Sequence, residues 1–213
     1  MDRPDLDPGL REQALQGLER LRRIVLRPGP LLEAIDQNLP PSTGSTVRLV
    51  ELGSGTGTLC AWIGDQLERR GRRVEMVATD MKEGPGVNAF DCSGKGEWMD
   101  ADLYFSNLLL HHLDQDEIRR SMAGQLLHSR FGAIHLDLAR GAVSYYLARV
   151  FMPLMGCSRI NQSDGLLSIQ AAFRAEELEA LAREYSRRAK VLPVFPFRQV
   201  LILPKDENPS PGR

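Results

Sequence analysis

The sequence predicts an α/β fold, an open and mostly parallel sheet with helices on both faces. Apolar runs alternate with helical patterns from residue 47 onward, which is the rhythm of parallel strands joined by crossover helices. The chain has 213 residues, 42% of them hydrophobic, so it can bury one sizeable core. Only residues 196–198 separate the last two apolar runs, so these strands should pair as an antiparallel hairpin.

Each element follows from a local pattern. An amphipathic helix leads the chain, and a short helix over residues 31–38 follows it. Strands are expected over residues 47–52, 74–79, 101–108, 132–138, 191–195 and 199–203. The apolar helix stripes are Leu10, Ala14, Leu18, Leu21 and Val25; Leu59, Ile63 and Leu67; Ile118, Met122 and Leu126; and Leu178, Leu181, Ala182 and Tyr185.

This order of elements predicts three regions. A helical cap occupies residues 1–45, and one sheet domain occupies residues 46–204, with an apolar insertion at 139–168. Residues 205–213 are polar and rich in proline, so they form a disordered tail.

Composition narrows the classes of function. The formal net charge of −1 gives no global electrostatic case for nucleic acid or an acidic membrane as the main partner. Cys60, Cys92 and Cys157 form no C-x-x-C pair, which suits buried thiols in a reducing cytoplasm. The first residues lack the layout of a secretory signal, and Arg149 and Pro153 break the longest apolar run, so we expect no membrane span.

A glycine-rich turn follows the first buried strand. Residues 51–57 read Glu-Leu-Gly-Ser-Gly-Thr-Gly. The dinucleotide fingerprint G-x-G-x-x-G fails in both frames, because its third glycine falls on Thr58 or on Cys60. The phosphate loop of nucleotide hydrolases fails too, since no Gly-Lys-Ser or Gly-Lys-Thr follows the turn.

The residues around this turn suit a nucleoside ligand. Open parallel sheets bind ligands at the carboxyl ends of their strands, and glycine there lets the backbone approach a ligand closely. The helix that starts near Thr58 can point free amides at a carboxylate. Asp80 closes the next strand, where its carboxylate can accept hydrogen bonds from both ribose hydroxyls. The pairing predicts an enzyme that binds S-adenosylmethionine.

Residues 47–138 resemble the class I S-adenosylmethionine-dependent methyltransferases, which have a Rossmann-like doubly wound sheet, and the closing helix and hairpin keep that family's order. The resemblance implies that Asp80 binds the ribose and that Asp91 bonds the adenine amine. It also implies that residues 102–113 line the methyl-transfer site. The implied cofactor residues are Glu51, Gly53, Ser54, Gly55, Gly57, Asp80, Met81, Asp91 and Asn107.

One segment departs from the family pattern. Only 21 residues, 81–101, separate Asp80 from the fourth strand, where the family usually fits a helix, a strand and another helix. From the family's order we expect a degenerate helix and a short third strand over residues 87–90. Asp91 is therefore either the adenine-binding acid or an acid on a surface loop.

Four polar residues near the strand ends each have two possible roles. His111 or His112 could act as a general base, with His112 also a contact to the acceptor, or both could cap the strand and pack against the next helix. His135 and Asp137 share one face of the fifth strand. A metal pair is conceivable, but the simpler account places His135 in the core and Asp137 toward the acceptor, with no metal site.

The insertion at 139–168 is expected to choose the substrate. It is apolar nearly all round, so it folds over the site as a lid, extends the core, or forms the face of a homodimer. As a lid, it would contact the acceptor through Arg140, Tyr145, Tyr146 and Phe151. Residues 164–173, with residues 176–178 after them, resemble small methyltransferases of bacterial aromatic and polyketide pathways.

Together these features predict O-methylation of a small aromatic or lipid-like acceptor. An RNA or protein methyltransferase is the rival enzyme. Against it, residues 106–109 read Ser-Asn-Leu-Leu instead of Asn-Pro-Pro-Tyr, and no dominant basic stripe suggests nucleic acid as a partner. A partner protein that keeps the fold without catalysis is the other alternative.

Overall fold

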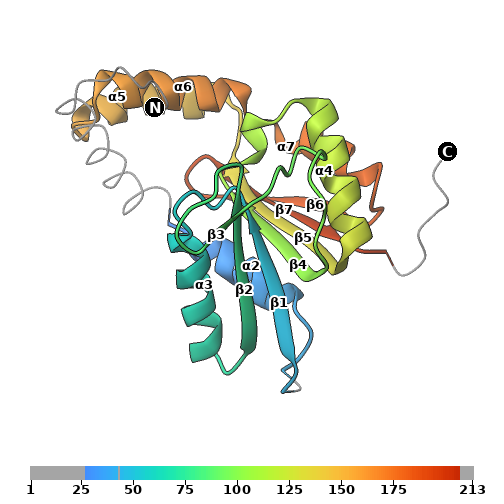
Figure 1. Cartoon of the computed structure of the whole chain (residues 1–213). Helices are drawn as coiled ribbons and strands as arrows, with labels where there is room; N and C mark the ends of the chain where they lie inside the picture. Colours follow the sequence, from blue (N-terminus) through green and yellow to red (C-terminus); the bar gives the residue numbers. More distant parts are fainter. Residues whose placement is uncertain (1–26, 43, 207–213) are drawn as a thin grey trace.

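A seven-stranded sheet organises the chain, with the strand order β3-β2-β1-β4-β5-β7-β6 (Figure 1). The computed structural model describes residues 27–42 and 44–206. Five strands are parallel, β7 runs antiparallel to β5, and β6 pairs with β7 as the expected hairpin. The strands are β1 (Thr46–Leu52), β2 (Arg73–Asp80), β3 (Val87–Ala89), β4 (Ala101–Asn107), β5 (Ser129–Leu138), β6 (Lys190–Val194) and β7 (Arg198–Pro204).

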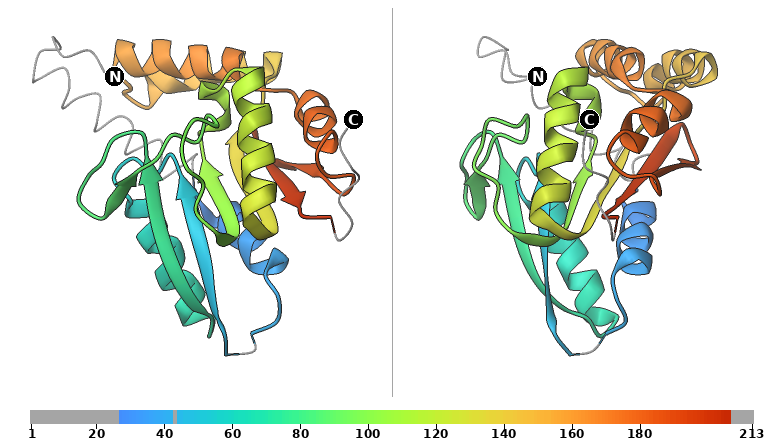
Figure 2. Two further views of the ribbon diagram at one scale, coloured as in Figure 1. Left: turned by 45° about the vertical axis from the view of Figure 1, so that its right-hand side comes forward. Right: turned by 90° about the vertical axis from the view of Figure 1, so that its right-hand side faces the viewer.

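Helices cover both faces of the sheet (Figure 2). α2 (Gly29–Asn38) and α3 (Thr58–Arg69) pack on one face through a core that includes Ile35 and Ile63. α4 (Gln115–His128) and α7 (Ala175–Arg183) pack on the other face through Ile118 and Leu178. The predicted open α/β sheet is therefore confirmed, whereas the predicted leading helix and most of the tail lie outside the described residues.

The register of the central strands places the glycine turn between two neighbouring strand ends. Leu52, the last residue of β1, pairs with Thr79 of β2 on one side and with Ser106 of β4 on the other. β1 can occupy this central place because Leu49 and Val50, on its opposite faces, are both fully buried. The carboxyl ends of β1, β2 and β4 consequently meet at one edge.

The short segment between β2 and β4 differs from expectation in one respect. β3 is present, but no degenerate helix forms between Asp80 and β4. An aromatic cluster takes the place of a helix on that face: Trp98 packs edge-on against Phe90 and Tyr104, at centroid distances of 5.0 and 5.4 Å. Gly124 of α4 makes room, since a β-carbon there would lie 2.1 Å from the Trp98 ring.

The apolar insertion forms two paired helices, α5 (Ala142–Leu154) and α6 (Arg159–Ala171). They lie beyond the carboxyl ends of the strands, and α6 contacts the short helix η1 (Leu110–His112) (Figure 1). None of the described helices has the length and apolar character needed to cross a bilayer.

Candidate cofactor and acceptor site

The glycine turn holds three glycines in the left-handed region, with φ of 66° at Gly53, 60° at Gly55 and 71° at Gly57. Such angles strain any residue with a β-carbon, so the motif is a backbone requirement. Space around the turn differs from glycine to glycine. A β-carbon at Gly53 would lie 2.7 Å from Leu109, whereas nothing lies within 4 Å of the corresponding position at Gly55. The turn is thus packed on one side and open on the other.

Glu51 is buried beneath this turn, and its carboxylate is not fully hydrogen-bonded. It is 2% exposed, and one carboxylate oxygen, Oε2, has no hydrogen-bond partner. Burial raises the pKa of Glu51 to about 7; the charge of Asp80 adds to the rise, and the backbone amide of Cys60 opposes it. The Ser54 hydroxyl oxygen is also buried without a partner. Buried polar atoms normally have partners, so these two atoms fit a ligand that brings donors or positive charge.

Asp80 connects the second strand to the glycine turn. Its carboxylate accepts a hydrogen bond of 2.9 Å from the Gly55 amide, and the Ser54 amide donates to the Thr79 carbonyl at 2.8 Å. One Asp80 oxygen therefore positions the turn, and the partly exposed carboxylate can accept further donors. Gly53, Ser54, Gly55, Gly57 and Asp80 come together as the sequence predicts, although their role in cofactor binding is still a prediction.

The remaining predicted cofactor residues border the same edge. Asn107 ends β4 one residue beyond the Leu52–Ser106 pair, and Met81, directly after Asp80, is 75% exposed. The neighbouring Phe90 amide donates to the Asp80 carbonyl at 2.7 Å, which brings Asp91 close to this edge. Asp91 also closes its own turn by accepting from the Ser93 amide at 2.9 Å, and the hydrogen bonds from Ser93 lower its pKa.

The loop after β4 rests against the glycine turn in a strained conformation. Leu108 has φ of 59°, a left-handed angle that is rare for a leucine. Its amide continues the sheet by donating to the Leu136 carbonyl at 2.8 Å. The next residue, Leu109, fills the space that the missing β-carbon of Gly53 leaves. Strain of this kind tends to cluster at functional sites, and the sequence pattern carries no sign of it.

His111 and Asp137 form a buried pair. His111 Nδ1 lies 2.6 Å from Asp137 Oδ1, and the His111 amide donates to Oδ2 at 3.0 Å. Because a carboxylate only accepts, Nδ1 is the donor in this pair, and in the neutral form of His111 the lone pair is on Nε2. Both residues were predicted to be functional from the sequence, but their contact was not. It could have been inferred from the expectation that β4 and β5 are neighbours, because groups at the carboxyl ends of neighbouring parallel strands can meet.

His112 and His135 have different surroundings. The His112 side chain is exposed, and its ring lies 4.1 Å from that of His111. His135 is fully buried between Ser106 Oγ, at 2.7 Å from Nδ1, and Gln125 Oε1, at 2.9 Å from Nε2. Burial lowers the pKa of His135 to about 4, so it is a neutral core residue with both nitrogens bonded.

The predicted acceptor residues of the insertion lie apart from these groups. Tyr146 and Phe151 are 65% and 54% exposed, and Tyr145 packs edge-on against Tyr146 at 5.6 Å. Arg140 is engaged by both oxygens of Glu177 at 2.5 Å. These three aromatic rings line neither of the two cavities described below, and their role as acceptor contacts stays a prediction.

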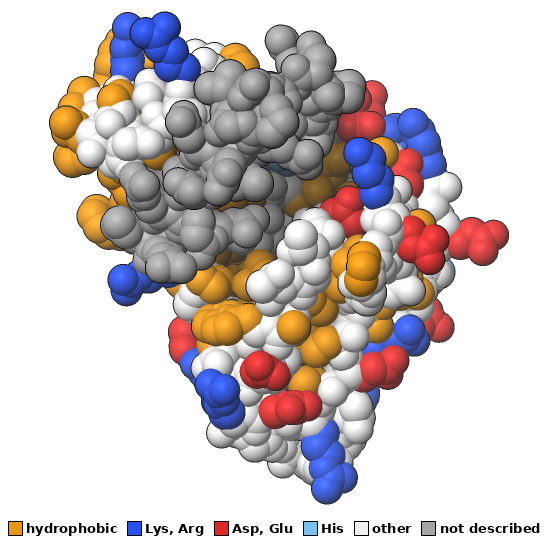
Figure 3. All heavy atoms as spheres, turned by 60° about the vertical axis from the view of Figure 1, so that its left-hand side comes forward, with side chains coloured by type: hydrophobic (Ala, Val, Ile, Leu, Met, Phe, Trp, Pro, Cys, Tyr) orange, Lys and Arg blue, Asp and Glu red, His pale blue; other side chains and the backbone are white. Residues whose placement is uncertain are grey.

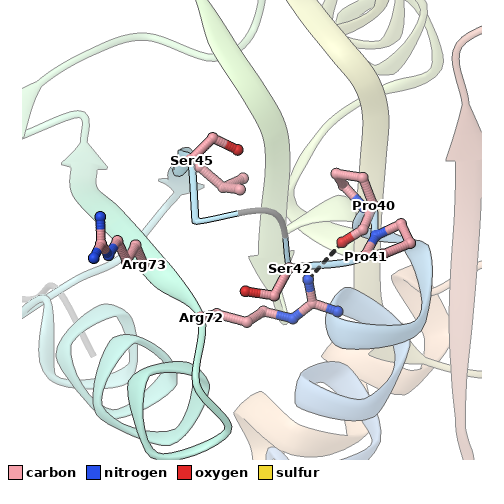
Figure 4. Close-up of a pocket in the computed structure, with 7 residues that line it drawn as sticks. Pro40, Pro41, Ser42, Ser45, Arg72 and Arg73 are labelled. Carbon is pink, nitrogen blue, oxygen red and sulfur yellow. Dashed lines mark hydrogen bonds between the residues drawn. The ribbon is translucent and has the colours of Figure 1, made fainter.

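Two cavities in the described part of the chain lie away from the glycine turn. The smaller, about 10 Å³, is at the amino ends of β1 and β2, where Arg72 donates to the Pro40 carbonyl at 2.7 Å (Figure 4). It has room for about one water molecule, at the edge opposite the site. The larger, about 350 Å³, runs between α4 and α7 and is lined by Arg119, Arg140, Phe173 and Glu177 among others.

Comparison with known proteins bears on the fold. No protein-family model and no curated protein sequence matches the chain. Among solved structures, it resembles human N-acetylserotonin methyltransferase in complex with SAM, with a TM-score of 0.56 and 13% identity, over 92% of this chain and 55% of that one. It also resembles the S-adenosylmethionine-dependent methyltransferase SibL in its apo form, with a TM-score of 0.56 and 11% identity, over 92% of this chain and 58% of that one. The chain thus spans little more than half the length of these two proteins.

A third match is a putative Zn-dependent alcohol dehydrogenase from Rhodobacter sphaeroides, with a TM-score of 0.50 and 13% identity, over 89% of this chain and 96% of that one. Topology separates the two kinds of sheet, because the dinucleotide-binding order 3-2-1-4-5-6 lacks an antiparallel strand between its last two. Here antiparallel β7 lies between β5 and β6. The chain shares a Rossmann-like fold with these two methyltransferases.

Proposed function

We propose that this protein is an S-adenosylmethionine-dependent methyltransferase that acts on a small acceptor. The observation that carries the proposal is the unsatisfied pair of buried groups, Glu51 Oε2 and Ser54 Oγ, under an open glycine turn. A ligand with a cationic amino acid portion supplies what these oxygens lack. Asp80, at the end of the next strand, is placed to accept from ribose hydroxyls of the same ligand.

In this proposal the chain's own residues hold and orient the cofactor. Glu51 and Ser54 lie at the methionine end and Asp80 at the ribose, and the exposed Met81 side chain offers an apolar surface to the adenine. Asp91 and Asn107 complete the cofactor contacts. When bound, S-adenosylmethionine supplies an activated methyl group on its sulfonium, so positioning of the acceptor can carry much of the rate.

The acceptor group that fits the site best is a hydroxyl. His111 Nε2 keeps a lone pair because Asp137 holds the opposite side of the ring, an arrangement that suits removal of a proton from an attacking oxygen. The exposed His112 then contacts the acceptor. The apolar insertion favours an aromatic or lipid-like molecule, and the buried free thiols Cys60 and Cys92 suit a reducing cytoplasm.

Calorimetry with S-adenosylmethionine tests the proposal. The wild-type chain should bind the cofactor, and Asp80→Ala should weaken binding by more than about tenfold, or about 1.4 kcal/mol. Asp65→Asn is the matched control, because Asp65 is an exposed acid on α3, and its dissociation constant should equal the wild-type value. Absence of binding by the wild-type chain would overturn the proposal, and an unchanged constant in Asp80→Ala would remove Asp80 from the ribose role.

A further inference from the structure

The outward face of α5 is apolar along its whole length. Five side chains, which we name the α5 apolar arc, are more than half exposed: Val143, Tyr146, Val150, Phe151 and Leu154. At about 100° per residue they fall within an arc of roughly 140°, whereas a soluble surface helix normally turns polar residues outward. The buried residue Met152 marks the opposite side of the helix, and the buried Ser144 lies at the edge of the arc beside Phe151.

This orientation is held by packing against α6. Met152 is 6% exposed and meets α6 at Gly165, where a β-carbon would lie 2.7 Å from the Met152 methyl carbon. The Ser144 hydroxyl donates to the Gly141 carbonyl at 2.8 Å. Rotating α5 to bury its apolar arc would break this packing. α6 extends the apolar surface with Leu167, which is 62% exposed.

Basic residues outnumber acidic ones around the arc. Residues 139–171 include Arg140, Arg149 and Arg159 and one acid, Asp164, in a chain whose net charge is −1. Arg140 is paired with Glu177, whereas Arg149 and Arg159 are exposed at the α5–α6 end of the molecule. Figure 3 shows hydrophobic side chains gathered beside Lys and Arg side chains at its upper left. An apolar surface with basic neighbours is complementary to an anionic lipid surface.

We propose that the α5 apolar arc docks on an anionic lipid bilayer, with α5 lying flat at the boundary between headgroups and acyl chains. Tyr146 and Phe151 are aromatic residues of the kind that settle at that depth. The local basic cluster supplies the attraction that the net charge of the whole chain lacks.

Docking in this way would serve an apolar acceptor. The helix pair lies beyond the carboxyl ends of the strands, and α6 contacts η1, which carries His111 and His112. A molecule dissolved in the bilayer would then reach the protein next to these histidines. This consequence rests on the proposed methyl transfer, whereas binding to the bilayer does not.

Vesicle flotation with the full chain tests the docking. The wild-type protein should bind vesicles of equal phosphatidylcholine and phosphatidylglycerol more tightly than vesicles of phosphatidylcholine alone, and high salt should weaken the difference. The triple variant Val143→Ser, Val150→Ser and Leu154→Ser, which changes one line of the arc, should lower partitioning at least about tenfold. Arg149→Gln should lower it about fivefold on the anionic vesicles only.

Leu127→Ser is the matched control, because Leu127 is 74% exposed but lies on α4. It should bind vesicles as the wild type does, and thermal unfolding should show that all variants fold. Absence of wild-type vesicle binding, or full binding by the triple variant, would overturn the docking. So would light scattering that finds a wild-type dimer which the triple variant converts to a monomer. Calorimetry with S-adenosylmethionine on the same samples reports separately on the proposed enzyme function.

Discussion

At the scale of single residues, Glu51 is a buried carboxyl group whose position lowers the stability of the free protein. A carboxyl group with 2% exposure and an unpartnered oxygen is costly to bury, and its pKa of about 7 reflects that cost. Folded proteins keep such groups where a ligand compensates them. Glu51 should therefore oppose the folding of the free protein and favour binding of the cofactor.

Glu51→Gln separates these two effects. At pH 8 the variant should unfold with a free energy about 2 kcal/mol higher than the wild type, because it removes a buried charge beside Asp80. Its affinity for S-adenosylmethionine should fall at least about tenfold. Urea denaturation and calorimetry measure the two quantities. A variant that is less stable than the wild type at this pH would show that Glu51 is satisfied in the free protein.

Asp137 should act through His111. In Asp137→Asn, the amide can donate to Nδ1, which favours the tautomer with its proton on Nε2 and so removes the base. With an identified acceptor, we expect kcat to fall at least about a hundredfold while the dissociation constant of S-adenosylmethionine stays within about twofold. The Asp137→Asn change leaves the His112 side chain as it is in the wild type. If kcat fell about a hundredfold in His112→Gln and did not fall in Asp137→Asn, the base would be His112.

At the scale of elements, the segment between β2 and β4 replaces a helix with three packed rings. Trp98 covers the face of the sheet that a helix would otherwise cover, and it does so because α4 has a glycine at position 124. This arrangement shortens the chain without exposing the core. It also leaves β3 with only three residues at the edge of the sheet, a length that discourages pairing with another molecule.

Gly124→Ala should break this arrangement. The added carbon would lie 2.1 Å from the Trp98 ring, so the ring must move and the free energy of unfolding should fall by about 2 kcal/mol. Gly29→Ala is the control, because no atom lies within 4 Å of its added carbon, and its stability should change by less than about 0.5 kcal/mol. Equal stability of both variants would show that Trp98 moves without cost.

At the scale of the whole molecule, two buried groups set opposing dependences of stability on pH. The folded pKa of Glu51 is raised from 4.5 to about 7, so stability is lost as pH rises across that window. The folded pKa of His135 is lowered from 6.5 to about 4, so stability is lost as pH falls across that window. Each pKa shift corresponds to about 3 kcal/mol of free energy of unfolding. Between pH 4.5 and 6.5 the two groups change this free energy in opposite directions, so their pH dependences should nearly cancel.

Variants that lack one of the two groups should reveal the pH dependence of stability that the other group causes. The wild-type protein should show nearly constant free energy of unfolding between pH 4.5 and 6.5. In Glu51→Gln, stability should rise with pH across this window, because only His135 remains. In His135→Gln it should fall with pH, because only Glu51 remains. Urea denaturation at several pH values measures these slopes, and the same slope in both variants would contradict the assignment.

Most of the fold was predictable because it depends on local patterns. The pattern of apolar residues predicted six of the seven strands, and the family's order predicted β3. The glycine spacing together with Asp80 predicted where the carboxyl ends of β1 and β2 meet. The missing helix between β2 and β4 was not predictable, since it depends on the contact of Trp98 with Gly124, residues far apart in the sequence.

The candidate site was predictable only in part. Its residues could be named from their places at strand ends, but the pairing of His111 with Asp137 requires knowing that β4 and β5 are neighbours. The apolar character of α5 was plain in the sequence, whereas the side that faces outward depends on Met152 packing against Gly165. Periodicity cannot distinguish a buried face from an exposed apolar one.

The position of Trp98 also gives the protein an optical reporter. The chain has two tryptophans, Trp62 on α3 and Trp98. The Trp98 indole packs on Phe90, whose amide donates to the Asp80 carbonyl, so a ligand that moves Asp80 changes the surroundings of the indole. In Trp62→Phe protein, fluorescence emission would arise from Trp98 alone. Occupancy of the site could then be followed in an unlabelled solution, before any acceptor is known.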